Sequence, residues 1–268
     1  MTSYLLRKLQ SFQNGTSSSA AETAGDVVIE EIPNSDKTDE IERSKVGIMR
    51  AVVQAQDPSA KDLDDPMMRR FLRARDLDVE KASAMLLKYL KWRKECVPNG
   101  DISPSDITAD LGHNKLFMQG HDKTGRPIVV VFAARHKPTN VEDFKRYVTF
   151  SLDKISARMP SGQEKFTAIA DLEGWGYANS DIRGYLASLT ILQDYYPERL
   201  GKFFIIHVPY IFMTAWKMIY PFIDKNTKKK IIFVEDKKLQ LTLLQDIDES
   251  QLPDTFGGKL KLVPIQDC

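Results

Sequence analysis

Residues 128–134 read IVVVFAA, an unbroken apolar run that directly follows the turn sequence DKTGRP at residues 122–127. Three similar short runs lie further along the chain: FTAIADL at 166–172, KFFIIHV at 202–208 and KIIFVE at 230–235. Strands that are apolar without alternation are typical of a sheet that is covered on both faces. The four runs therefore predict four buried strands.

Helical patterns separate these strands, at residues 141–158, 182–195 and 210–224. Strands that alternate with helices at this spacing are typical of a parallel sheet with helices on its faces. We therefore predict an α/β fold whose mainly parallel sheet is flanked by helices.

The stretch before this region, residues 41–98, has the pattern of a small all-helical subdomain. Apolar residues from Ile41 to Val53 lie mostly on one helical face. Asp65 followed by Pro66 resembles an N-cap with proline at the first helical position, and Asp78 resembles a second N-cap. The last helix is expected to end before Pro98.

Residues 1–40 are predicted to be a disordered tail. They include the low-complexity stretch TSSSAA at 16–21, and they carry seven acidic residues against three basic ones. Within this tail, a few apolar residues beside Arg7 and Lys8 could form a short interfacial helix or could be part of a mobile segment: Leu5, Leu6, Leu9 and Phe12.

The composition limits the cellular setting. The net charge is +1, so charge alone does not attract the whole molecule to nucleic acid. Two cysteines exclude a disulfide framework, and no apolar run has the length of a membrane span or the character of a secretory signal. We therefore expect a cytoplasmic protein.

The sequence lacks the motifs of common enzymes and metal sites. It has no GxSxG elbow, no phosphate-binding loop and no HExxH, and the four histidines show no metal-ligand spacing. Gly174 and Gly176 do not continue into a dinucleotide fingerprint and instead predict a sharp turn. His207 lies in an apolar run, where we expect a hydrogen-bonded core histidine. No catalytic residue, cofactor or metal is predicted.

The stretch at 209–230, PYIFMTAWKMIYPFIDKNTKKK, is apolar on nearly every face of a helix. Such a helix is either a core helix or a lid with one side on a cavity and the other on a membrane. Its bulky aromatic residues favour the lid. The lysines that follow could contact anionic headgroups at about 1 kcal/mol each.

Six motifs in order carry a family resemblance: RFLRAR at 70–75 with DVEKA at 78–82, DKTGRP at 122–127, DLEG at 171–174, YPERLGK at 196–202, PFID at 221–224 and LPDTFGG at 252–258. With them the chain resembles the CRAL-TRIO family, most closely its phosphatidylinositol-transfer-type members, over roughly residues 45–260. The resemblance implies a helical N-terminal subdomain, a lipid-binding domain at 105–262 with an enclosed pocket, and a gating helix at 209–224.

The resemblance also implies the site residues. The gating helix and pocket would use Phe212, Trp216, Ile219, Tyr220 and Phe222. The lipid headgroup would meet Arg75, Glu198, Thr227 and Lys230. Arginine and lysine can neutralise a phosphate, threonine can donate a hydrogen bond, and glutamate can accept from inositol hydroxyls or hold Lys230. Alternatively, Glu198 could form an ion pair with Arg199 that orders the loop.

Two features depart from the family pattern. Members that also bind phosphatidylcholine carry hydroxyl side chains where this chain has Phe166 and Ala168, and Thr167 between them should face the other way. Asp76 follows Arg75, where a basic residue is common. Choline-lipid binding is therefore not expected.

The resemblance implies a monomeric protein that is not an enzyme, binds one phospholipid, favoured as phosphatidylinositol, and exchanges it during transient contact with a membrane surface. It would need no cofactor and bind no nucleic acid. Two alternatives remain at this stage: a carrier of a tocopherol-type or terpenoid-type hydrophobe, and a membrane-recruited adaptor that senses lipid.

Overall fold

The computed structural model describes residues 35–268, with side chains from Asp39 onward. This part of the chain divides into two compact units, a helical unit that ends at Cys96 and an α/β unit that begins at Val97. The boundary between the two units, after Cys96, lies close to residue 98.

The helical unit consists of α2 (Ser35–Gln56), the 3-10 turn η1 (Pro58–Asp62), α3 (Asp65–Arg73) and α4 (Val79–Cys96). The predicted inner face of α2 is buried in a shared core with α3 and α4, where Met49 and Val53 are fully covered. Asp78 caps α4 as predicted, since its Oδ1 accepts from the backbone N–H of Lys81 at 3.0 Å. The amphipathic pattern therefore identified this unit.

Two predicted boundaries in this unit are wrong. Helix α2 begins at Ser35, so the predicted disordered segment at 1–40 extends too far. The N-cap of α3 is Asp64, whose carboxylate accepts from the Met67 N–H at 2.8 Å, and Asp65 is already helical. The remaining tail, 1–34, and the interfacial helix proposed within it lie outside the described residues.

The α/β unit contains one five-stranded sheet, with the strands side by side in sequence order. Its strands are β1 (Leu116–His121), β2 (Pro127–Phe132), β3 (Phe166–Asp171), β4 (Leu200–Ile206) and β5 (Ile231–Phe233). Strands β2 to β5 are parallel and correspond to the four predicted runs, while β1 pairs antiparallel with β2. The prediction missed β1 because Gln119 and Gly120 interrupt its apolar character.

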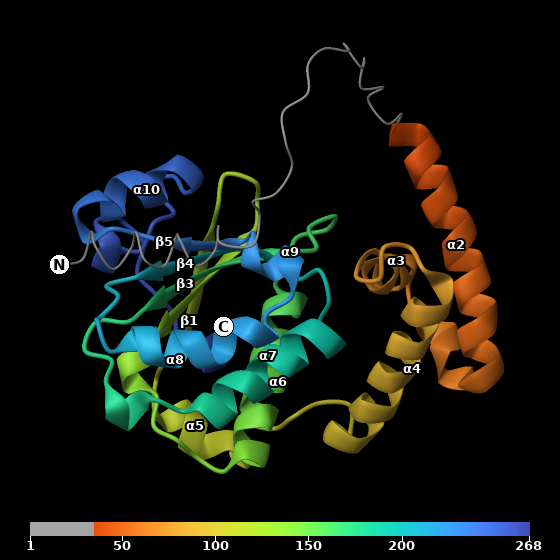
Figure 1. The fold of residues 1–268 in the computed structure, drawn as a ribbon, viewed down its shortest axis with the longest axis horizontal. Coiled ribbons are helices and arrows are strands. Elements are labelled where there is room, and N and C mark those ends of the chain that lie inside the picture. Colours follow the sequence, from red (N-terminus) through yellow and green to blue (C-terminus); the bar gives the residue numbers. More distant parts are fainter. Residues whose placement is uncertain (1–34) are drawn as a thin grey trace, which may run out of the picture. The chain divides into compact units, whose positions relative to one another are not determined.

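Helices cover both faces of this sheet (Figure 1). The α-helices of this unit are α5 (Thr108–Gly112), α6 (Val141–Ala157), α7 (Ile182–Tyr195), α8 (Phe212–Ile219), α9 (Lys225–Lys228) and α10 (Leu239–Asp246). Its 3-10 turns are η2 (Pro104–Ile107), η3 (Ala133–Arg135), η4 (Tyr177–Asn179), η5 (Tyr220–Phe222), η6 (Asp236–Lys238), η7 (Asp254–Phe256) and η8 (Ile265–Asp267). Helices α6, α7 and α8 lie on one face and α10 on the other (Figure 1).

A buried charged network joins several of these elements. The ammonium of Lys115, just before β1, donates to Asp110 Oδ1 at 2.6 Å and approaches His136 Nδ1 at 3.0 Å. The other nitrogen of His136, Nε2, lies 3.2 Å from the carboxylate of Asp181, which caps α7. With Nδ1 facing an ammonium and Nε2 facing a carboxylate, the neutral imidazole with its proton on Nε2 fits the site.

This network predicts loss of stability in mild acid. Burial, followed by the charge of Lys115, lowers the pKa of His136 below its ordinary value of 6.5. The unfolded chain therefore binds a proton near pH 6.5 that the folded chain does not, and the free energy of unfolding should fall as the pH drops below about 6.5. One proton accounts for at most about 1.4 kcal/mol per pH unit.

Chemical denaturation between pH 7.5 and 5.5 tests this prediction. The variant His136→Gln keeps an acceptor for Lys115 and a donor for Asp181 but does not titrate, so its stability should depend less on pH than that of the parent chain. Equal pH dependence of the two proteins would assign the effect to other groups.

Candidate functional site

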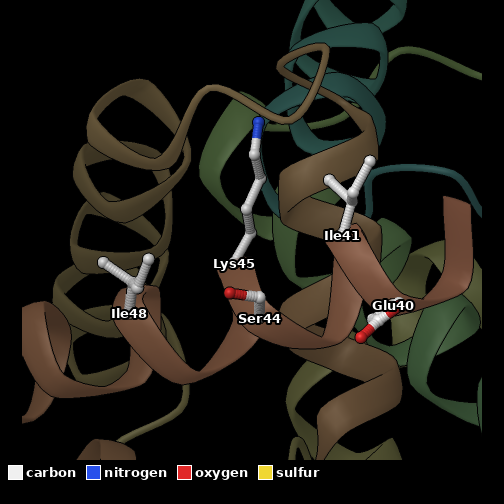
Figure 2. Close-up of a pocket in the computed structure, with 5 residues that line it drawn as sticks. All are labelled: Glu40, Ile41, Ser44, Lys45 and Ile48. Atoms are coloured by element: carbon white, nitrogen blue, oxygen red, sulfur yellow. The ribbon is translucent and has the colours of Figure 1, made fainter. Parts of the chain in front are cut away.

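A surface hollow runs along one side of helix α2 in the helical unit. Figure 2 shows its lining residues, Glu40, Ile41, Ser44, Lys45 and Ile48. All five come from one helix, and Ile41 and Ile48 are exposed. A hollow of this kind leaves its contents in contact with water. It is therefore unsuited to enclosing acyl chains.

The two faces of the sheet in the α/β unit differ in how completely they are sealed. On the α10 side five residues of the central strands expose no surface, while Phe132 and Ile232 at the periphery are partly buried: the five are Ile128, Val130, Ile169, Phe204 and Ile206. On the α8 side the middle of the sheet carries Ala168 and Ala170, which keep 7% and 8% of their surface accessible. Phe203, beside Ala168 on β4, is only half-buried. The small side chains of Ala168 and Ala170 thus lie in the middle of the sheet on the side that α6, α7 and α8 cover.

Helix α8 lies directly on the sheet at the β5 edge of this region. The ring of Trp216 packs edge-on against Phe233 of β5, with centroids 5.0 Å apart. Phe212 contacts Trp175 in the same way, at 5.5 Å. Both α8 aromatics are buried, whereas Ile219 and Tyr220 are half-buried. The inner side of the helix therefore belongs to the core.

The outer side of the same segment is apolar but exposed. Met218 exposes 52% and Phe222 61% of its surface, with Lys217 exposed beside them. The α-helix ends before Pro221, which cannot donate a backbone hydrogen bond, and the chain continues as η5. The segment thus combines a buried aromatic side with an exposed apolar side.

One side chain of α7 holds the end of this segment. The amide of Gln193 donates to the carbonyl oxygen of Phe222 at 3.1 Å, and its oxygen accepts from the N–H of Asp224 at 2.8 Å. Asp224 in turn caps α9 by accepting from the N–H of Thr227 at 2.8 Å. Gln193 therefore fastens the carboxyl end of the segment to α7 through exposed hydrogen bonds.

A charged cluster lies at the amino ends of three neighbouring strands. Lys165 precedes β3, Glu198 is close to the start of β4, and Lys230 precedes β5. One carboxylate oxygen of Glu198 lies 3.6 Å from each of the two lysine ammonium groups. Glu198 adopts a left-handed backbone with a φ of 58°, which is uncommon for a residue with a side chain. The cluster keeps one more positive than negative charge.

The structure places the other predicted headgroup residues as follows. Thr227 lies in the turn that leads to Lys230, whose N–H donates to the Thr227 carbonyl oxygen at 3.0 Å. Arg199 donates to the Glu164 carbonyl oxygen at 3.1 Å, while the ion pairs of Glu198 run to Lys165 and Lys230. Arg75 belongs to the helical unit, where it donates to the carbonyl oxygen of Ala74. Sequence reasoning missed Lys165.

Two further sequence expectations have clear outcomes. Thr167 points to the α10 side, as predicted, and donates to Asp122 Oδ2 at 2.7 Å. His207 is hydrogen-bonded, with its Nδ1 2.8 Å from Asp171 Oδ1, but it follows the end of β4 and is partly exposed. The expectation of a core histidine is therefore wrong, because the strand ends at Ile206, two residues before the end of the apolar run.

Comparison with known proteins identifies the family. The model of the CRAL/TRIO domain matches residues 111–258, and that of the CRAL/TRIO N-terminal domain matches residues 36–88. The chain belongs to the CRAL-TRIO family. Among the described helices of this CRAL-TRIO chain, none is both long and apolar enough to cross a membrane.

Several curated CRAL-TRIO relatives are similar over most of the chain. The SEC14 cytosolic factor of Candida glabrata is 30% identical over 83% of this chain and 79% of its own length. The SEC14 cytosolic factor of Eremothecium gossypii is 34% identical over 74% of this chain and 70% of its own length. The phosphatidylinositol/phosphatidylcholine transfer protein SFH12 of Arabidopsis thaliana is 31% identical over 76% of this chain and 41% of its own.

A solved structure shows the same fold. The crystal structure of Sfh5 aligns with a TM-score of 0.55 at 20% identity, covering 67% of this chain and 68% of that chain. This likeness supports the α/β architecture of the CRAL-TRIO unit.

Proposed function

We propose that this protein carries one phospholipid between membranes, with phosphatidylinositol as the favoured cargo, and that it performs no catalysis. The acyl chains lie over Ala168 and Ala170 on the α8 side of the sheet. The observation that carries the proposal is the pair of small, slightly accessible alanines at the centre of the α8 side, where the opposite side has central residues that expose no surface. The printed names of the cytosolic factors and transfer proteins among its relatives support it.

The energetics require enclosure of this cargo. Exposing acyl chains to water costs about 0.8 kcal/mol per methylene, so a two-chain lipid with roughly 30 methylenes costs on the order of 25 kcal/mol. Only a covered chamber recovers such a cost. The segment α8–η5, with residues Phe212–Phe222, is the proposed gate, and it opens where a bilayer receives its exposed side.

An unpartnered polar atom on the gate supports a bound lipid. In the described part of the chain, the indole Nε1 of Trp216 is buried without a hydrogen-bond partner. A buried donor left in this state costs about 1–3 kcal/mol. An ester oxygen of a bound lipid supplies an acceptor for it, which neighbouring apolar side chains cannot do.

The cluster of Lys165, Glu198 and Lys230 is the proposed headgroup end of the chamber. Lys230 neutralises the phosphate, and the carboxylate of Glu198 accepts from inositol hydroxyls. Thr227 donates from the adjacent helix α9. The favoured setting is a cytoplasmic monomer that contacts membranes transiently.

Native mass spectrometry of the purified protein tests this function. We expect a one-to-one complex whose mass excess is identified as a phospholipid after extraction, together with transfer of labelled phosphatidylinositol between vesicles. A protein that is empty and takes up no lipid from vesicles would refute the proposal. A bound ring hydrophobe would instead favour the carrier of that class, and binding without transfer would favour a lipid-sensing adaptor.

The two hydrogen bonds of Gln193 to the end of the gate are expected to slow its opening. Replacing Gln193 with alanine removes both bonds to the segment end, each of which contributes about 0.5–1.5 kcal/mol. Gate opening is taken as the slow step of exchange. We therefore expect vesicle-to-vesicle transfer to become several-fold faster, with no loss of equilibrium loading. The control is Thr190→Ala on the exposed side of α7, which should leave the transfer rate unchanged. Unchanged transfer by Gln193→Ala would exclude Gln193 as a latch.

A further inference from the structure

Two groups of side chains in the described residues each bring three possible metal-ligating residues together: Asp110, His113 and His136, and Asp171, Glu173 and His207. The first group already holds a cation. The ammonium of Lys115 lies 2.6 Å from Asp110 Oδ1, 3.0 Å from His136 Nδ1 and 3.5 Å from His113 Nδ1. A metal ion there would have to displace a buried lysine, so this group is a closed structural network.

The second group has no such internal cation. Asp171 is the last residue of β3, and His207 directly follows the last residue of β4. Because these strands are parallel neighbours, both residues lie at the carboxyl ends of the strands. Glu173 is two residues beyond Asp171 and donates its N–H to Asp171 Oδ1 at 2.9 Å. Within the described chain, no lysine or arginine lies at ion-pair distance from these two carboxylates.

We propose that Asp171, Glu173 and His207 form a site for a divalent transition-metal ion, with zinc as the expected occupant. One ligand atom from each residue lies within 4.8 Å of the other two. Zinc bonds nitrogen and carboxylate oxygen at about 2.0–2.2 Å, so its ligands lie roughly 3–4 Å apart. Glu173 is exposed and can swing inward over the remaining distance.

The burial of the three residues suits an open site. Asp171 is buried and fixed, His207 is partly exposed, and Glu173 faces solvent, so an ion can enter and keep water in its remaining positions. Two carboxylates match the charge of a divalent ion, and the imidazole favours zinc over magnesium, which prefers oxygen ligands throughout. The ion would brace the end of β4 two residues before Pro209, where the chain leaves the sheet for α8.

Isothermal titration of the full chain with zinc chloride tests this site. The parent background carries serine at Cys96 and Cys268, because cysteine thiols also bind zinc. We expect one saturable site whose affinity falls tenfold or more in His207→Asn and in Glu173→Gln. Asparagine tolerates the left-handed backbone of residue 207, which has a φ of 50°, and can still hydrogen-bond to Asp171, so the fold should persist.

The matched control is His113→Asn, which changes the lysine-filled group and should leave the titration unchanged. Absence of saturable binding in the parent background would overturn the proposal. So would binding that is equally strong in His207→Asn, and so would loss of binding in His113→Asn alone, because each would place the ion elsewhere.

Discussion

Replacing Met218 and Phe222 together with aspartate is expected to weaken binding to phospholipid vesicles by roughly tenfold to a hundredfold or more. Both side chains are exposed on the outer side of the gate, next to Lys217. Burying a fully exposed side chain of this size contributes about 1.5–3 kcal/mol, and these two still expose 52% and 61% of their surface, so together they contribute about 1.5–3 kcal/mol. This corresponds to a loss of roughly tenfold to a hundredfold in vesicle affinity, to which repulsion of aspartate by anionic lipid adds.

Vesicle sedimentation and lipid transfer measure this loss. Leu241→Asp on α10 is the matched control, since Leu241 is an apolar residue with 67% of its surface exposed on the other side of the sheet. That variant should bind vesicles as the parent chain does, and circular dichroism should show all proteins folded. If Leu241→Asp weakened binding equally, or if the double variant bound normally, the gate would not be the membrane-contacting surface.

The parallel sheet could be predicted from sequence because each central strand is a continuous apolar run. The helical pattern between two of these runs placed α7 at residues 182–195, the range that the structure has. Strand β1 escaped prediction because its glycine and glutamine resemble loop residues, whereas β5, at the other edge of the sheet, is an apolar run and was predicted. Local pattern therefore predicts strands whose apolar run is unbroken, whether or not they lie at an edge of the sheet.

The gate shows a second limit of sequence patterns. Its sequence is apolar nearly all round, which predicts burial on every side or contact with lipid. The structure separates the two sides: Trp216 is buried on the sheet, and Met218 is exposed. Which side of the helix is buried depends on where β5 and Phe233 lie beneath it. This information comes from tertiary packing and not from the local sequence.

Contacts between distant residues could be predicted only where topology brings them together. Lys165, Glu198 and Lys230 are far apart in the chain, but each lies just before a parallel strand or close to its start, so one edge of the sheet collects them. Applied to Lys165, this rule would have found the missed partner of Glu198. No comparable rule predicts the contact between Lys115 and His136, because both residues lie outside the strands and loops determine their positions.

Replacing Lys230 with alanine is expected to weaken loading of phosphatidylinositol by roughly tenfold to a hundredfold. A hydrogen bond to a charged group contributes about 1.5–3 kcal/mol, and the phosphate would lose that contact. The carboxylate of Glu198 would keep Lys165 at 3.6 Å, so the loop should remain folded. The removed ammonium is mostly shielded, with 20% of the side chain exposed, so water screens its interaction only in part.

Equilibrium loading from vesicles, with bound lipid quantified by mass spectrometry, measures this effect. Lys229→Ala is the matched control, because it removes an exposed lysine of the same turn and should reduce membrane attraction slightly without changing the bound lipid. Loading of an uncharged ring hydrophobe should be equal in both variants, since it presents no phosphate. Normal phosphatidylinositol loading by Lys230→Ala would remove Lys230 from the headgroup site and favour a cargo held by its apolar surface alone.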